Sequence, residues 1–160
     1  MAALLALALI AGCAPRGRPG SGPEPVYFRM GPLELSATIE QEGVDLMGSV
    51  DIMNTSGRPV TVEYDGGCSL AVLLPGETGP LWDQAEWWLS RPGICPASSA
   101  TTLKIPARTM ARILTPSMTT MEIAGDSIPR GTFPGAVRMR MLAPDDTTLI
   151  FPAGIVRLNG

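Results

Sequence analysis

Side chains able to carry out chemistry are scarce in this sequence. The 160 residues include no histidine and three cysteines. Without an imidazole, Ser-His-Asp and Cys-His arrangements are unavailable, and a metal site loses its commonest ligand. A carboxylate pair for glycoside hydrolysis is the one enzymatic alternative left open, but no Asp or Glu stands in a setting that singles it out. We therefore predict that the protein is not an enzyme, and we expect no catalytic residue, metal or cofactor.

The first cysteine, Cys13, ends an apolar N-terminal run. Residues 2–11 are all apolar, which suits the hydrophobic region of a signal peptide and is about half the length of a membrane-spanning helix. The stretch Ile10–Cys13, an aliphatic residue, two small residues and a cysteine, resembles the lipobox of bacterial lipoproteins. This resemblance implies that residues 1–12 are a signal peptide and that Cys13 is the lipidated new N-terminus.

A lipid on Cys13 would anchor the protein in a membrane of the cell envelope, facing the periplasm or the exterior. No Lys or Arg precedes the apolar run, although a signal peptide ordinarily has a basic start. An ordinary signal peptide or an apolar helix, with Cys13 incidental, is the alternative.

The remaining sequence divides into a tether and one domain. Residues 13–25 are rich in Pro and Gly, and we expect them to form a flexible tether behind the lipidated cysteine. Residues 26–160 are enough for a single folded domain. A formal net charge of −3 argues against a nucleic-acid partner, which needs clustered Lys and Arg to neutralise phosphates.

Cys68 and Cys95 are left as a pair once Cys13 is assigned to the lipid. In an exported protein two such cysteines predict a disulfide, because disulfides persist in oxidising compartments. A thiol pair for metal or redox work is the alternative, but the sequence has neither a Cys-x-x-Cys motif nor a histidine.

Most of the sequence alternates between apolar and polar residues with a period of two, which predicts half-buried strands. The first two strands are expected at 33–40 and 44–54, with a hairpin turn at Gly43. Their predicted inward-facing residues are Leu33, Leu35, Ala37, Ile39, Val44, Leu46, Val50 and Ile52. Further strands are expected at 60–65, 70–74, 103–105, 111–115, 136–142, 149–151 and 155–158, with one more containing the three tryptophans. The predicted fold is therefore all-β, an antiparallel β-sandwich of about seven to nine strands.

Three segments carry a distinctive pattern of strands and turns. In Val50–Tyr64 a strand ends in Asn-x-Ser, turns and resumes as a β-branched strand. Leu81–Asp83 is a later strand that contains a tryptophan, and Asp126–Phe133 is a turn before an alternating strand. These segments resemble the BsuPI-type proteinase-inhibitor domains and their Ig-like relatives. The resemblance spans residues 33–158 and implies an antiparallel Ig-like β-sandwich.

Two groups of residues are candidates for contact with a partner. The first is Trp82, Trp87 and Trp88, and neighbours on a strand point to opposite faces, so one of the adjacent pair is expected to be exposed. An exposed indole could bind a sugar ring or a protein, whereas a purely structural role covering the sandwich end is the alternative. The second candidate is the loop containing Pro92, Ile94 and Cys95, which could be an inhibitory loop stiffened by proline and a disulfide, or an ordinary loop.

These observations predict a membrane-anchored cell-envelope lipoprotein with a non-catalytic binding or structural domain. Its expected partners are the membrane, through the lipid on Cys13, and another envelope protein or a protease. The alternative function is a proteinase inhibitor that acts through a loop near the Cys68–Cys95 disulfide.

Overall fold

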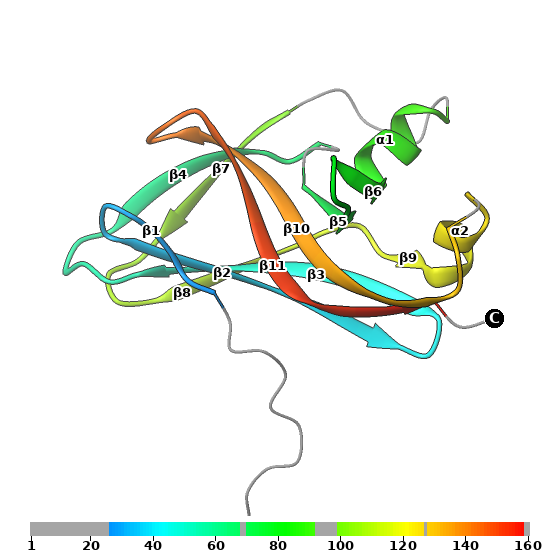
Figure 1. Ribbon diagram of the computed structural model, residues 1–160. Coiled ribbons are helices and arrows are strands. Elements are labelled where there is room, and N and C mark those ends of the chain that lie inside the picture. Colours follow the sequence, from blue (N-terminus) through cyan, green and yellow to red (C-terminus); the bar gives the residue numbers. More distant parts are fainter. Residues whose placement is uncertain (1–25, 68–69, 92–98, 127, 159–160) are drawn as a thin grey trace, which may run out of the picture.

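The computed structural model describes residues 26–67, 70–91, 99–126 and 128–158, which form two antiparallel sheets packed face to face (Figure 1). The first sheet contains β1 (Phe28–Met30), β2 (Leu33–Glu42), β3 (Asp45–Asn54), β8 (Met110–Leu114) and β9 (Met118–Thr119). The second contains β4 (Val60–Asp65), β5 (Ala71–Pro75), β6 (Pro80–Asp83), β7 (Ala100–Ile105), β10 (Gly131–Ala143) and β11 (Thr147–Leu158). The predicted antiparallel sandwich is confirmed, with eleven strands in the described residues instead of seven to nine.

The β2–β3 hairpin follows the predicted alternation closely. Its register runs without a break from Leu33 opposite Asn54 to Glu42 opposite Asp45. Gly43 has a φ of 61° in the turn, a left-handed conformation that glycine adopts without a steric cost. Val44 was predicted to face inward and is instead exposed, because it lies in the turn before β3 begins.

The long β10–β11 ribbon of the second sheet reaches β2 of the first sheet. One edge of β10 pairs with β11 along its length, while the other edge pairs first with β5 and then with β4. The register shifts between Gly135 and Ala136, and such a bulge bends a ribbon and increases its twist. At the far end of β11, the Gln41 carboxamide accepts from the Arg157 N–H at 2.9 Å and donates to its carbonyl at 2.8 Å. A side chain of β2 therefore pairs with the backbone of β11 as another strand would.

The core consists of two hydrophobic clusters. The larger cluster lies between the sheets and includes Leu35, Ile52 and Phe151, whereas the smaller one includes Leu46, Trp82 and Ile123. Along β3 the two clusters meet at Gly48, where an added Cβ would lie only 2.9 Å from a Val137 methyl group. This close approach explains a glycine in the middle of a buried strand.

Two short helices lie together at one end of the molecule, away from β1 and the turn that joins β3 to β4 (Figure 1). They are α1 (Gln84–Leu89) and α2 (Thr120–Ala124). None of the helices in the described ranges is long and apolar enough to cross a membrane. The helices are the main departure from the sequence-based expectation, and they carry the candidate site.

Candidate functional site

Helix α1 replaces the strand that was predicted to carry Trp87 and Trp88. The Asp83 carboxylate accepts a hydrogen bond from the Ala85 N–H at 2.9 Å and caps the helix. Trp88 and Ala85, three residues apart, are buried, whereas Glu86 and Leu89 point outward. The prediction of a strand was therefore wrong, and helical spacing decides which tryptophan is buried.

Buried polar contacts fix α1 to the second sheet. Gln84 is fully buried, and its side chain accepts from the Val72 N–H at 2.8 Å and donates to the Pro116 carbonyl at 3.0 Å. Arg138 donates to the second oxygen of Asp83 at 2.6 Å. The start of α1 is thus attached to β5, β10 and the segment before β9.

Helix α2 begins with a capping box. The Thr119 hydroxyl accepts from the Glu122 N–H, and the Glu122 carboxylate accepts in return from the Thr119 N–H. Ile123 is buried in the smaller core cluster, while Met121 points outward. The reciprocal cap allows so short a helix to form at a definite position.

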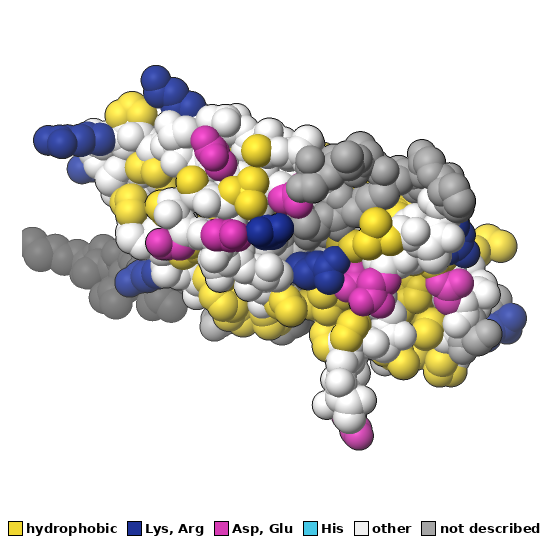
Figure 2. Space-filling view, turned by 90° about the horizontal axis from the view of Figure 1, so that it is seen from above, with side chains coloured by type: hydrophobic (Ala, Val, Ile, Leu, Met, Phe, Trp, Pro, Cys, Tyr) yellow, Lys and Arg dark blue, Asp and Glu magenta, His cyan; other side chains and the backbone are white. Residues whose placement is uncertain are grey.

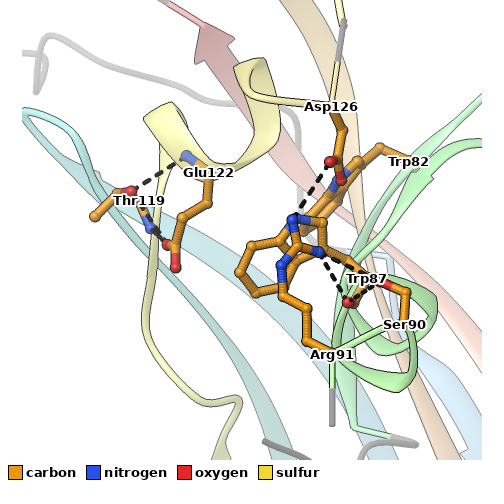
Figure 3. Close-up of polar contacts among 7 residues, drawn as sticks. All are labelled: Trp82, Trp87, Ser90, Arg91, Thr119, Glu122 and Asp126. Carbon is orange, nitrogen blue, oxygen red and sulfur yellow. Dashed lines mark hydrogen bonds and ion pairs between the residues drawn. The ribbon is translucent and has the colours of Figure 1, made fainter.

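Asp126 connects the two helices (Figure 3). One of its oxygens accepts from the Trp82 indole N–H at 3.1 Å, and the other lies 3.6 Å from Nη2 of Arg91. Trp82 lies near the end of β6, Arg91 follows α1 and Asp126 follows α2. We call α1, α2, Trp82, Arg91 and Asp126 together the helical end.

Arg91 is stacked on Trp87 within the helical end. Its guanidinium carbon lies 3.7 Å from the centroid of the Trp87 ring, and Nη1 donates to the Trp87 carbonyl at 3.1 Å and contacts the Ser90 hydroxyl at 3.3 Å (Figure 3). The Trp87 indole N–H is buried and has no hydrogen-bond partner in the described residues. Buried donors are nearly always paired, so this one needs an explanation.

Large apolar side chains are exposed at the helical end. Leu89 on α1 is 71% exposed and Met121 on α2 is 70% exposed. Leu81 on β6 is also exposed. Exposed apolar side chains next to a tryptophan and an arginine have the composition of a protein-binding surface.

The charges on the rest of the surface are mixed. On the face drawn in Figure 2, basic and acidic side chains lie among one another and form no continuous basic patch among the described residues.

Two exposed ion pairs on this surface shift the pKa values of their members. The pKa of Arg112 is raised by its hydrogen bonds to Asp51, and the pKa of Arg140 is raised by its hydrogen bonds to Asp146. The pKa of Asp146 is lowered by the same contact. In the ranges that the structure describes, no three Cys, Asp or Glu side chains are grouped so that they could hold a metal ion.

The three predicted tryptophans do come together at one end of the sandwich, with Trp82 and Trp88 buried and Trp87 partly exposed. Cys13, Cys68, Pro92, Ile94 and Cys95 lie outside the described residues, so the lipidation, the disulfide and the loop stay predictions. Arg91 and Asp126 were missed as site residues. The spacings Asp83-x-x-Glu86 and Thr119-x-x-Glu122, typical of helix starts, are the signals that would have revealed both helices.

No protein-family model matches this sequence, and no curated protein is significantly similar to it. The fold and the site define an antiparallel β-sandwich with two short helices at one end. The function is therefore inferred from the geometry of that end and from the N-terminal sequence.

Proposed function

We propose that this protein is a membrane-anchored cell-envelope lipoprotein whose β-sandwich binds another envelope protein and catalyses no reaction. In this proposal Cys13 carries the lipid, residues 13–25 form the tether, and the helical end is the contact surface. The apolar run before Cys13 and the Pro/Gly-rich residues after it support the anchor.

The observation that carries the proposed contact surface is the exposure of Leu89 and Met121 on two helices that are held in place. Ordinarily a short helix at the end of a sandwich points its largest apolar residues inward. Here each helix buries one apolar face, through Trp88 or Ile123, and still presents a second large apolar side chain to solvent. Because the caps and Asp126 fix both helices, a partner would meet an ordered surface and little entropy would be lost on binding.

Site-specific photo-crosslinking in cells tests the contact surface. A photoreactive residue is placed at Leu89 or Met121, with matched controls at Met110 and Leu114, which are 56% and 50% exposed on β8. We expect the two helical positions to give the same discrete crosslinked protein and the two β8 positions to give none. Crosslinks of equal yield at all four positions, or none from the helices, would contradict a contact at the helical end.

Replacing Cys13 tests the anchor separately. We expect Cys13→Ser to move the protein from the membrane fraction to the soluble fraction, because the thioether to the lipid cannot form. Metabolic labelling with a fatty acid should mark the wild-type protein and not the variant. A variant that is still labelled and membrane-bound would rule out Cys13 as the lipidated residue.

A further inference from the structure

Several hydrogen-bond donors of the Trp87–Arg91 stack have no acceptor in the described residues. Nη1 of Arg91 is used by the Trp87 carbonyl and the Ser90 hydroxyl, but Nε makes no hydrogen bond within the described ranges. Nη2 lies 3.6 Å from the nearest carboxylate oxygen there, that of Asp126, which is longer than a hydrogen bond. The Trp87 N–H on the ring beneath also has no partner in this part of the protein, but it is buried, so an incoming ligand reaches only the guanidinium edge.

The unpaired groups on this edge are therefore all donors. A guanidinium presents five N–H donors and cannot accept a hydrogen bond. A group that completes this site must bring oxygen atoms that accept, and the positive charge of Arg91 favours an anion.

We infer that the Arg91–Trp87 stack binds a carboxylate of the partner protein, either from an acidic side chain or from the partner's terminal residue. This inference rests on the proposed function, since it names the chemistry that the helical end recognises. Stacking on Trp87 and the two contacts of Nη1 fix the guanidinium plane, so the Nε and Nη2 edge is oriented before a ligand arrives.

The same molecule shows how such an edge holds a carboxylate. Arg112 uses Nε and Nη2 to bind both oxygens of Asp51, at 2.7 and 2.9 Å. Arg140 binds Asp146 in the same way, at 3.1 and 3.1 Å. The corresponding edge of Arg91 lacks this partner in the described residues, so a carboxylate from another molecule fits the geometry.

The charges around Arg91 favour a carboxylate over a phosphate group. Asp126 forms the ion pair with Arg91, and it offsets part of the positive charge of the guanidinium. One arginine beside one aspartate suits a singly charged planar anion better than a phosphate with a charge of about −2. Removing the charge of Asp126 is therefore expected to strengthen carboxylate binding.

Nuclear magnetic resonance of the full-length protein in detergent micelles tests this inference through the indole N–H signals. The three signals are assigned with Trp→Phe variants, and the protein is titrated with sodium acetate, with sodium phosphate and with sodium chloride at equal ionic strength. We expect a saturable shift of the Trp87 signal with acetate, a weaker effect of phosphate and no saturable effect of chloride.

Variants of the two charged residues decide the outcome. Arg91→Gln should abolish the saturable acetate shift, and Arg91→Lys, which keeps the charge but loses the planar edge, should weaken it. Asp126→Asn still accepts from Trp82 and should tighten acetate binding by about fivefold, the factor that corresponds to an ion-pair effect near 1 kcal/mol. Unchanged near-ultraviolet circular dichroism shows that each variant is folded. A shift that persists in Arg91→Gln, no saturable shift in the wild type, or tighter binding of phosphate than of acetate would each overturn the inference.

The crosslinking experiment separates this inference from the proposed function. Acetate binding through Arg91 without a crosslinked partner at Leu89 and Met121 would leave the carboxylate site standing and remove the proposed contact surface. A crosslinked partner whose yield is unchanged by Arg91→Gln would leave the contact surface standing and remove the carboxylate site.

Discussion

Two buried polar groups, one at each end of the sandwich, differ in whether the protein itself satisfies them. At the turn after β3, the fully buried Asn54 donates from Nδ2 to the carbonyls of Arg58, Ile105 and Pro106 at 2.8, 3.2 and 3.0 Å. Its oxygen accepts from the N–H and the hydroxyl of Ser56. Both the amide oxygen and the amide nitrogen of Asn54 are hydrogen-bonded within the protein, which is typical of a structural residue.

At the helical end, by contrast, the buried Trp87 N–H and the Nε edge of Arg91 have no acceptor in the described residues. The difference separates a polar side chain that holds the fold from the exposed edge of Arg91, which we propose is used by another molecule. Substitutions at the Asn54 turn should cost stability, whereas substitutions at the Trp87–Arg91 stack should chiefly affect binding.

The largest expected effect is at the Asn54 turn. Asn54→Ala should lower the free energy of unfolding by about 3–4 kcal/mol, because it removes a buried side chain, its bonds to three carbonyls and the acceptor of the Ser56 N–H and hydroxyl. Thr55→Ala is the matched control: its hydroxyl donates to the Pro32 carbonyl at an exposed position, and we expect a loss of about 0.5 kcal/mol. Urea unfolding measures both. If the two variants lose the same stability, the Asn54 network is not what holds this end together.

At the helical end, the residue that should matter most for stability is Asp83, which lies beneath α1. Asp83→Ala removes the helix cap and leaves Arg138 without its partner, and we expect a loss of about 2–3 kcal/mol. Asp83→Asn keeps a capping oxygen and loses only the ion pair, so about half of the loss should be recovered. Thermal unfolding of the two variants tests this division, and equal losses would contradict a separate contribution from the cap.

Gly48 lies between the two core clusters, and its substitution should have a smaller effect. A Cβ at this position would meet methyl groups of Val137, Thr115 and Val72 at 2.9–3.0 Å. Those β-branched side chains cannot rotate away freely, so Gly48→Ala should cost about 1–2 kcal/mol. Gly57→Ala, with nothing within 4 Å of the added Cβ, is the control and should leave stability unchanged. A neutral Gly48→Ala would show that the two sheets can move apart at little cost.

The smallest effect concerns the exposed ion pair of Arg140 and Asp146. The hydrogen bonds from Arg140 lower the pKa of Asp146 in the folded protein below its ordinary value of 3.8. A lowered carboxyl pKa contributes stability above the unfolded pKa, and that contribution is lost as the pH falls through the folded pKa. Between about pH 5 and pH 2 the wild type should therefore lose slightly more stability than Asp146→Asn. Identical pH profiles in chemical denaturation would show that the pair contributes nothing measurable.

The fold could be predicted from the sequence where the alternation of apolar and polar residues continues over several repeats. Leu33, Leu35 and Ala37 are buried as the period of two predicts, and so are Leu46, Val50 and Ile52 across the hairpin. Each of these strands has ten residues and one buried face, so the pattern repeats several times.

The helical end could not be predicted in the same way. Helices of six and five residues complete fewer than two turns, which is too short for a helical period to show. Arg91 lies two residues beyond the end of α1, and the turn there, with the Arg91 N–H donating to the Trp88 carbonyl, brings its side chain back to Trp87. Because a strand was expected here, this stack was not. Asp126 is linked to Trp82 over 44 residues of sequence, and only the tertiary fold brings the two together.

The claim that the buried Trp87 N–H takes no part in holding the fold is tested most directly by the unfolding free energies of two tryptophan variants at the helical end. Trp82→Phe removes an N–H that donates to Asp126, and Trp87→Phe removes an N–H that has no partner in the described residues, while both keep an aromatic ring. We predict that Trp82→Phe loses about 1 kcal/mol and that Trp87→Phe is as stable as the wild type or slightly more stable. A loss in Trp87→Phe equal to that in Trp82→Phe would show that the Trp87 N–H stabilises the fold, and it would contradict the account in which this N–H is unpaired.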